Sequence, residues 1–220
     1  MTSNEPFDNV RVLTHSAIRL ESDGGAVLYF DPFDLAEEFH DADAVVITHS
    51  HHDHLSPEDV AKVAKEGTIV IAPETCVAEA AKLGGGMLIP LDANEAAEVK
   101  GVVIHAIPAY NVEPERLKFH PKENRWLGYV VTMDGITYYI AGDTDQNPDN
   151  ERVKCDVALI PIGGTYTMDA KQAAAFVNAI KPRLAIPTHY GTAVGSKEAV
   201  DEFEPLVDPS IKVMRKMEWR

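Results

Sequence analysis

The chain has 220 residues, 45% of them hydrophobic, which is enough for one sizeable domain with an ordinary apolar core. Its formal net charge of -15 at pH 7 disfavours a nucleic-acid partner bound by general electrostatics. There is no apolar run of about 18 residues and no signal-peptide pattern, and Cys76 and Cys155 have no motif spacing. We therefore expect a single domain over 1–220, with no membrane span, in the reducing cytoplasm.

The first half of the chain predicts strands followed by short helices. Asp23-Gly24-Gly25 is typical of a hairpin turn, and Ser56-Pro57-Glu58-Asp59 of a helix start with a serine N-cap and proline at the first helical position. The predicted strands are 10–20, 26–30, 44–47 and 68–72, and the predicted helices are 57–65 and 74–82.

The second half repeats this order. Asp134-Gly135 is a strong hairpin signal between two apolar runs. The predicted strands are about 87–89, 95–99, 101–107, 127–133, 136–141, 156–160, 184–186 and 211–214, and the predicted helices are 169–180 and 197–203. Hairpins that give way to mixed strands and helices, twice over, suit two sheets packed face to face with helices outside, an α+β sandwich.

Four histidines and one aspartate lie within residues 49–54. The pattern is H-x-H-x-D-H, formed by His49, His51, Asp53 and His54, with His52 at a variable position. The predicted buried strand 44–47 precedes it, so the motif occupies a strand-to-helix loop. Because imidazole nitrogen and carboxylate oxygen are the ligand types that zinc, iron and manganese accept, the motif predicts a metal site.

This motif after a buried strand resembles the signature of the metallo-β-lactamase superfamily. Further segments resemble its lactonase-like branch of metal-dependent hydrolases, which includes L-ascorbate-6-phosphate lactonase. They are Asp31-Pro32-Phe33, Trp126-Leu127-Gly128-Tyr129, Gly142-Asp143-Thr144, Pro161-Ile162-Gly163-Gly164, Thr167-Met168 and Pro187-Thr188-His189-Tyr190. The resemblance covers nearly the whole chain and implies a four-layer αββα sandwich with one or two metal ions, zinc first and manganese or iron as alternatives.

The resemblance also implies roles for the motif residues. His49 and His51 would hold one metal, and Asp53, His54 and His189 the other. Asp143 would bridge the two ions, and Asp53 would also orient the attacking water. Two cations that share a water lower its pKa towards about 7, which implies a hydrolase that uses a metal-bound hydroxide.

One family ligand has no counterpart. The family usually has a histidine just after the strand that here spans about 101–107, and Asn111 stands in its place. An amide oxygen is a poor zinc ligand, so Asn111 and the nearby His120 are alternative candidates for completing the first site. His105 lies inside the predicted strand and reads as structural.

Other residues are candidates for contacts with the substrate or the ligands. Asp31 follows a strand and could fix the tautomer of a ligand histidine, and His15-Ser16 resembles a Gly-His-Ser element of lactonase-like relatives. Tyr110 lies beside the missing ligand position. The loop 109–126 carries Arg116 and Lys118 together with Lys122 and Arg125, which either capture an anionic substrate or are balanced by nearby acids.

The expected function is hydrolysis of a small ester, lactone or phosphoester, by a chain that is a monomer or a homo-oligomer. Three alternatives stay open at this stage. A flavodiiron-like redox protein would need Glu in place of His51 and a flavin domain, a nuclease of the same fold is opposed by the charge of -15, and a non-catalytic metal sensor is compatible with the missing histidine.

Overall fold

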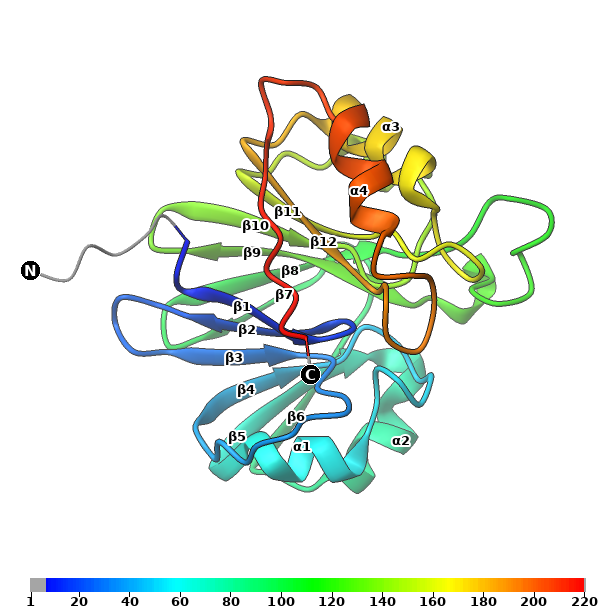
Figure 1. Ribbon diagram of the computed structural model, residues 1–220. Helices are drawn as coiled ribbons and strands as arrows, with labels where there is room; N and C mark the ends of the chain where they lie inside the picture. Colours follow the sequence, from blue (N-terminus) through cyan, green and yellow to red (C-terminus); the bar gives the residue numbers. More distant parts are fainter. Residues whose placement is uncertain (1–6, 220) are drawn as a thin grey trace, which may run out of the picture.

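Two β-sheets pack face to face in the computed structural model, which describes residues 7–219 (Figure 1). The first sheet contains, in spatial order, Val10–Thr14 (β1), Ala17–Glu21 (β2), Val27–Phe30 (β3), Ala42–Val46 (β4), Ala64–Pro73 (β5) and Met87–Leu91 (β6). The second sheet contains, in spatial order, Lys212–Val213 (β13), Leu184–Thr188 (β12), Val157–Pro161 (β11), Ile136–Ile140 (β10), Leu127–Met133 (β9), Val102–Pro108 (β8) and Ala96–Val99 (β7).

Helices cover the outer side of each sheet. Pro57–Val63 (α1) and Val77–Ala80 (α2) lie against the first sheet, and Ala170–Ile180 (α3) and Ala199–Phe203 (α4) lie on the side of the second (Figure 1). Helix α3 begins with a capping box, in which Asp169 accepts from the backbone of Gln172 and the Gln172 side chain reaches back. The result is the expected αββα sandwich, so the prediction of an α+β fold is confirmed.

The strand directions decide where the functional loops meet. Strands β3 to β6 run parallel in the first sheet, and β10 to β13 run parallel in the second, whereas the remaining neighbours are antiparallel. Side chains that follow parallel strands gather outside the carboxyl edge of a sheet. The loops after β3, β4, β10 and β12 carry Asp31, the histidine motif, Asp143 and His189, so each sheet presents part of the site at such an edge, whereas His120 lies in the loop after β8.

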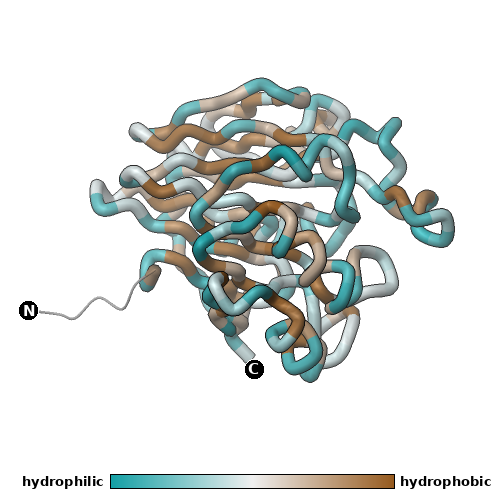
Figure 2. Tube along the Cα trace, turned by 90° about the horizontal axis from the view of Figure 1, so that it is seen from above, coloured by the Kyte–Doolittle hydropathy of each residue, from teal (hydrophilic) through white to brown (hydrophobic). Residues whose placement is uncertain are grey.

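The largest core cluster fills the space between the sheets and continues under α3. Phe30 and Val46 of the first sheet pack there with Tyr129 and Ile140 of the second. A second cluster, which includes Val45, lies between the first sheet and its helices. Apolar colour follows the strands in Figure 2, and polar colour is concentrated in many of the connecting loops, as burial of apolar surface requires.

Several predicted boundaries are corrected. The stretch predicted as a strand over 10–20 is two strands with a tight turn between them, because His15 adopts a φ of 48°. Helix α1 ends at Val63, and the helix expected over 74–82 is three short helical pieces, Glu74–Cys76, Val77–Ala80 and Ala81–Leu83. The single domain is expected over 1–220, and residues 1–6 and 220 of it lie outside the described residues.

The Asp134-Gly135 turn has the backbone that its sequence predicts, with a positive φ at both residues. Among the described residues, no helix is long and apolar enough to cross a membrane.

Candidate metal centre

Asp31 and Thr48 orient two histidines of the motif. Asp31 follows β3, and its Oδ2 accepts from Nδ1 of His54 at 2.7 Å and from the Thr48 hydroxyl at 2.6 Å. Since the Thr48 hydroxyl has spent its hydrogen on Asp31, its oxygen accepts from Nδ1 of His49 at 2.9 Å. Both rings therefore carry their proton on Nδ1, which leaves Nε2 free to bind a cation.

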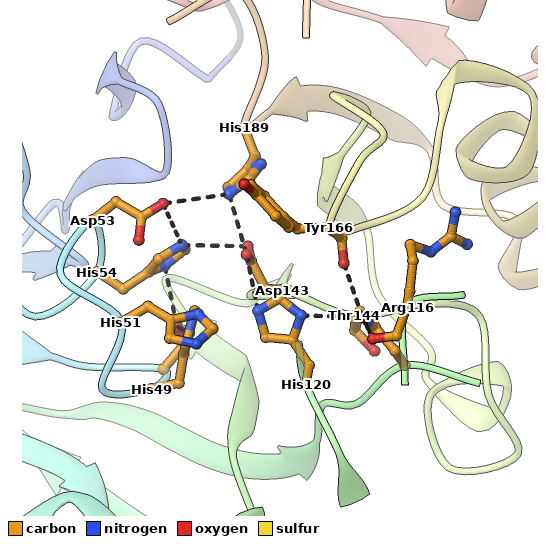
Figure 3. A network of polar contacts seen from close by, with 12 residues as sticks. His49, His51, Asp53, His54, Arg116, His120, Asp143, Thr144, Tyr166 and His189 are labelled. Carbon is orange, nitrogen blue, oxygen red and sulfur yellow. Dashed lines mark hydrogen bonds and ion pairs between the residues drawn. The ribbon is translucent and has the colours of Figure 1, made fainter. Parts of the chain in front are cut away.

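Three histidines converge at one end of the cluster. His49 and His51 come from the motif loop, and His120 comes from the loop before β9 (Figure 3). Their donor nitrogens lie within 4.8 Å of one another, and Nε2 of His49 is 3.0 Å from Nδ1 of His51. Two unprotonated nitrogens at that distance repel unless a cation or a proton lies between them, so the triad has the donor chemistry of a metal site.

A second group of donors lies next to the first. Asp53, His54, His189 and His15 also place donor atoms within 4.8 Å of one another. Nε2 of His189 and Nε2 of His54 are each 3.9 Å from Oδ2 of Asp53. His15 approaches the same oxygen at 3.2 Å, while its Nδ1 lies 2.9 Å from the Thr192 hydroxyl. His15 therefore positions Asp53.

Asp143 lies between the two groups. Its Oδ2 is 3.2 Å from Nε2 of His120 and 3.1 Å from Nε2 of His189, and its Oδ1 is 3.3 Å from Nε2 of His54. The carboxylate follows β10 and is almost fully buried. One acidic group thus faces donors of both groups, which is the arrangement expected of a bridging ligand (Figure 3).

The buried donors lack protein partners, which fits a missing cation. Nε2 of His54, Nε2 of His120, Nε2 of His189 and Oδ1 of Asp143 are buried without hydrogen bonds among the described residues. Orphaned buried polar atoms are costly, and divalent cations bound by the two donor groups would satisfy all four. Burial alone would raise the pKa of Asp143, but the nearby His189 and His54 hold it well below its usual range. Burial lowers the pKa of His49 well below its usual range, which favours the neutral ring that binds metals.

Asn111 is held through its amide nitrogen, whereas its Oδ1, the atom considered as a ligand, is buried without a hydrogen bond among the described residues. Its Nδ2 donates to the carbonyl oxygens of Arg116 and Tyr166 at 3.0 and 2.9 Å and lies 3.1 Å from Nδ1 of His120. Because Nδ1 and Nε2 are on opposite sides of the ring, Asn111 lies behind His120, away from Asp143. Of the two alternatives for the missing position, the structure brings only His120 to the other donors.

Of the two alternatives for the basic loop 109–126, balance by carboxylates fits three of its four cations. The guanidinium of Arg116 is buried and bonds Oδ1 of Asp145 at 2.8 Å, so its charge does not face the cluster. Lys122 bonds Asp149, and Arg125 pairs with Glu74 and Asp92. Tyr110 turns away as well, because its hydroxyl donates to Asp149 at 2.9 Å. Lys118 is exposed, with its ammonium 4.9 Å from the centre of the Phe119 ring.

Three residues near the cluster were not identified as site residues from the sequence. Thr48, which precedes His49 directly, is visible in the sequence only as a neighbour of the motif. Trp126 places its ring 4.8 Å from those of His49 and His51 and forms a wall of the site. Tyr166 extends its side chain towards His189 and Asp143 (Figure 3), and no local pattern identifies it.

Three histidines are not among the grouped donors, namely His40, His105 and His52, whose Nδ1 is 3.7 Å from Oδ1 of Asp53. His52 occupies the variable position of the motif, and its side chain is 88% exposed. His105 lines a separate cavity of about 410 Å³ together with Val130 and Lys154. Neither takes part in the cluster.

Comparisons with known proteins show the family to which the chain is similar. A sequence model described as the Beta-lactamase superfamily domain matches residues 9–189. A metal-dependent hydrolase of Pyrococcus abyssi is 33% identical, over 93% of this chain and 94% of its own length. The crystal structure of a protein described as a metal-dependent hydrolase from Parabacteroides distasonis has a TM-score of 0.79 and 33% identity, over 95% of this chain and 93% of its own. The metallo hydrolase Igni18 of Ignicoccus hospitalis, at 24% identity and a TM-score of 0.73, shares the fold.

Proposed function

This chain belongs to the metallo-β-lactamase superfamily and is a metal-dependent hydrolase, and we propose that it cleaves a small ester, lactone or phosphoester at the centre around Asp143. The observation that supports the proposal best is the position of Asp143, 3.1–3.3 Å from histidines of both donor groups. A shared carboxylate between two donor groups suits a pair of divalent ions. Membership of the lactonase-like branch is part of the same proposal.

The residues divide between two ions in this proposal. His49, His51 and His120 hold the first, and Asp53, His54 and His189 hold the second, with Asp143 shared. Zinc suits the nitrogen-rich first group, and manganese or iron also suit a site that contains two carboxylates. When bound, such ions activate water and polarise the oxygen of the bond to be cleaved.

The side chains around the donors prepare them for this chemistry. Thr48 and Asp31 accept from Nδ1 of His49 and His54, respectively, which leaves Nε2 of each ring as the atom for a cation. His15 is buried, and this burial lowers its pKa to about 4, so it is a neutral donor to Asp53. Asp53, held on one oxygen by His15, is the group that orients water and accepts its proton.

The proposal is tested by removing metal with a chelator and reloading with Zn²⁺, Mn²⁺ or Fe²⁺. Metal content is then measured together with hydrolysis of a carboxylic ester, a lactone and a phosphodiester. His54→Ala should lose metal and activity, whereas His52→Ala, which changes an exposed histidine of the same motif, should keep both. A protein that binds metal but hydrolyses none of the substrates would overturn the catalytic proposal in favour of metal sensing, and activity on the phosphodiester alone would favour the nuclease.

A further inference from the structure

The chemistry of the site's rim narrows the substrate class, an inference that rests on the proposed hydrolase function. The segment after β11 carries Tyr166, whose side chain points towards His189 (Figure 3). Tyr166 is 37% exposed, and its hydroxyl makes no hydrogen bond within residues 7–219. A partly exposed phenol near the donor cluster, whose hydroxyl has no hydrogen bond in the protein, is available to a ligand.

The backbone fixes Tyr166 in this position. The amide of Tyr166 donates to the carbonyl of Gly164 at 2.7 Å, and the amide of Gly164 donates to the carbonyl of Met168 at 3.0 Å. Thr165 adopts a φ of 60°, a conformation that is strained for a β-branched residue and persists only where its surroundings impose it. Strain of this kind collects at ligand-binding segments.

A second set of contacts joins Tyr166 to the loop 109–126, which carries the candidate ligand His120. Asn111 donates from Nδ2 to the Tyr166 carbonyl and also contacts His120. The ring of Phe119 packs edge-on against that of Tyr166, with centroids 4.7 Å apart. Phe119 directly precedes His120. The Tyr166 side chain and the candidate ligand His120 are therefore held in a fixed position relative to each other.

The charges near the entrance argue against a phosphorylated substrate. Phosphate recognition normally uses a free arginine or lysine, yet Arg116, Lys122 and Arg125 are paired with carboxylates. The fourth cation of the loop, Lys118, lies over the Phe119 ring. The side chain packed on Tyr166 is the apolar Phe119, and the same loop exposes the apolar Leu117 and Val112. A net charge of -15 adds repulsion for an anion at low salt.

We propose that the site hydrolyses an uncharged carboxylic ester or lactone with an apolar acyl part, whose carbonyl oxygen accepts a hydrogen bond from the Tyr166 hydroxyl. Water adds to the carbonyl carbon, and the bond from that carbon to the alkoxy oxygen breaks. The proton that water loses is delivered to the leaving alkoxide, so the products are an acid and an alcohol. Tyr166 donates to the oxygen that gains negative charge during the addition.

The experiment compares p-nitrophenyl butyrate and δ-valerolactone with p-nitrophenyl phosphate on the metal-loaded protein. The two uncharged substrates should give the higher kcat/KM. Tyr166→Phe should lower kcat for them about 10–100-fold, near the lower end of the loss seen when an oxyanion donor is removed. Metal content should stay unchanged, and the inhibition constant of δ-valerolactam, an uncharged carbonyl competitor, should rise.

Two matched variants test whether the effect is specific to the Tyr166 hydroxyl and whether the substrate is an ester or a phosphate. Tyr110→Phe removes a phenol whose hydroxyl faces Asp149, and it should leave kcat unchanged. Lys118→Gln removes the loop lysine that has no carboxylate partner within residues 7–219 and should also have no effect on the ester. A preference for the phosphate that depends on Lys118 would overturn the substrate class, as would a Tyr166→Phe protein with unaltered kcat and inhibition. A loaded wild-type protein inactive on all three substrates would instead overturn the hydrolytic proposal itself.

Discussion

Oδ2 of Asp31 lies 2.7 Å from Nδ1 of His54, so a carboxylate at the end of β3 sets the tautomer of a histidine in the loop after β4. Asp31→Asn removes the charge and replaces one of the two accepting oxygens with an NH2 donor, so it should weaken metal binding about 10–100-fold, as loss of such outer partners does elsewhere. Metal titration followed by competition with a chelator measures this change. Thr48→Ser keeps the hydroxyl and serves as the control, and equal affinities in all three proteins would contradict the tautomer argument.

Asp143→Asn tests the bridge. The substitution keeps the shape but removes the negative charge that faces His54, His120 and His189, so both metal content and hydrolysis should fall. Elemental analysis of the reloaded protein, together with ester turnover, checks this. If stoichiometry and turnover match the wild type, Asp143 does not bridge.

Asn111 is expected to stabilise the conformation of the loop 109–126, which carries His120. Asn111→Ala leaves the carbonyls of Arg116 and Tyr166 unpaired in a buried place, which should lower the free energy of unfolding by about 2 kcal/mol. It should also lower kcat, because His120 and Tyr166 lose a shared support. Thermal unfolding and ester kinetics measure the two effects. Tighter metal binding by Asn111→His would return position 111 to the ligand set.

Arg116 distinguishes substrate capture from a structural role. Its guanidinium bonds the buried Asp145, so Arg116→Met leaves an uncompensated charge and should cost about 3–5 kcal/mol of stability. For a chain of this size that corresponds to a fall in Tm of about 6–20 °C. Calorimetry checks the loss, and KM for an ester in the remaining folded protein should change little. A stable variant with a raised KM would restore the capture hypothesis.

The ionised carboxylate of Asp43 makes the stability of the fold depend on pH. The carboxylate accepts from the backbone of Val27 and from Lys65 and Lys100; although burial opposes the shift, these partners lower its pKa to about 2. A lowered pKa in the folded state means that the stabilisation is present above the unfolded pKa and is lost as pH falls from about 4 to about 2. Asp43→Asn should therefore lower the free energy of unfolding at pH 7 by about 1–2 kcal/mol. Denaturant titrations of both proteins at several pH values should show the difference shrinking below pH 4, whereas a constant difference would exclude this ion cluster as its source.

The sequence by itself determined the sandwich and most of the candidate donors. Strand and helix patterns are local, and the motif places four donors within six residues directly after a buried strand. Asp31, Asp143 and His189 each follow the end of a strand. The carboxyl ends of parallel strands lie at the same edge of their sheet. Residues whose position depends on a regular element can therefore be predicted from short windows of sequence.

Only the tertiary structure decided what the loop 109–126 does. This segment has no hydrophobic period, so nothing local indicates that His120 turns towards Asp143 while Asn111 turns behind it. Arg116 finds its carboxylate 29 positions away, and Asn111 reaches Tyr166 across 55. These contacts form because burying a charge or a carbonyl requires a partner, and which partner is near depends on how the two sheets bring their loops together.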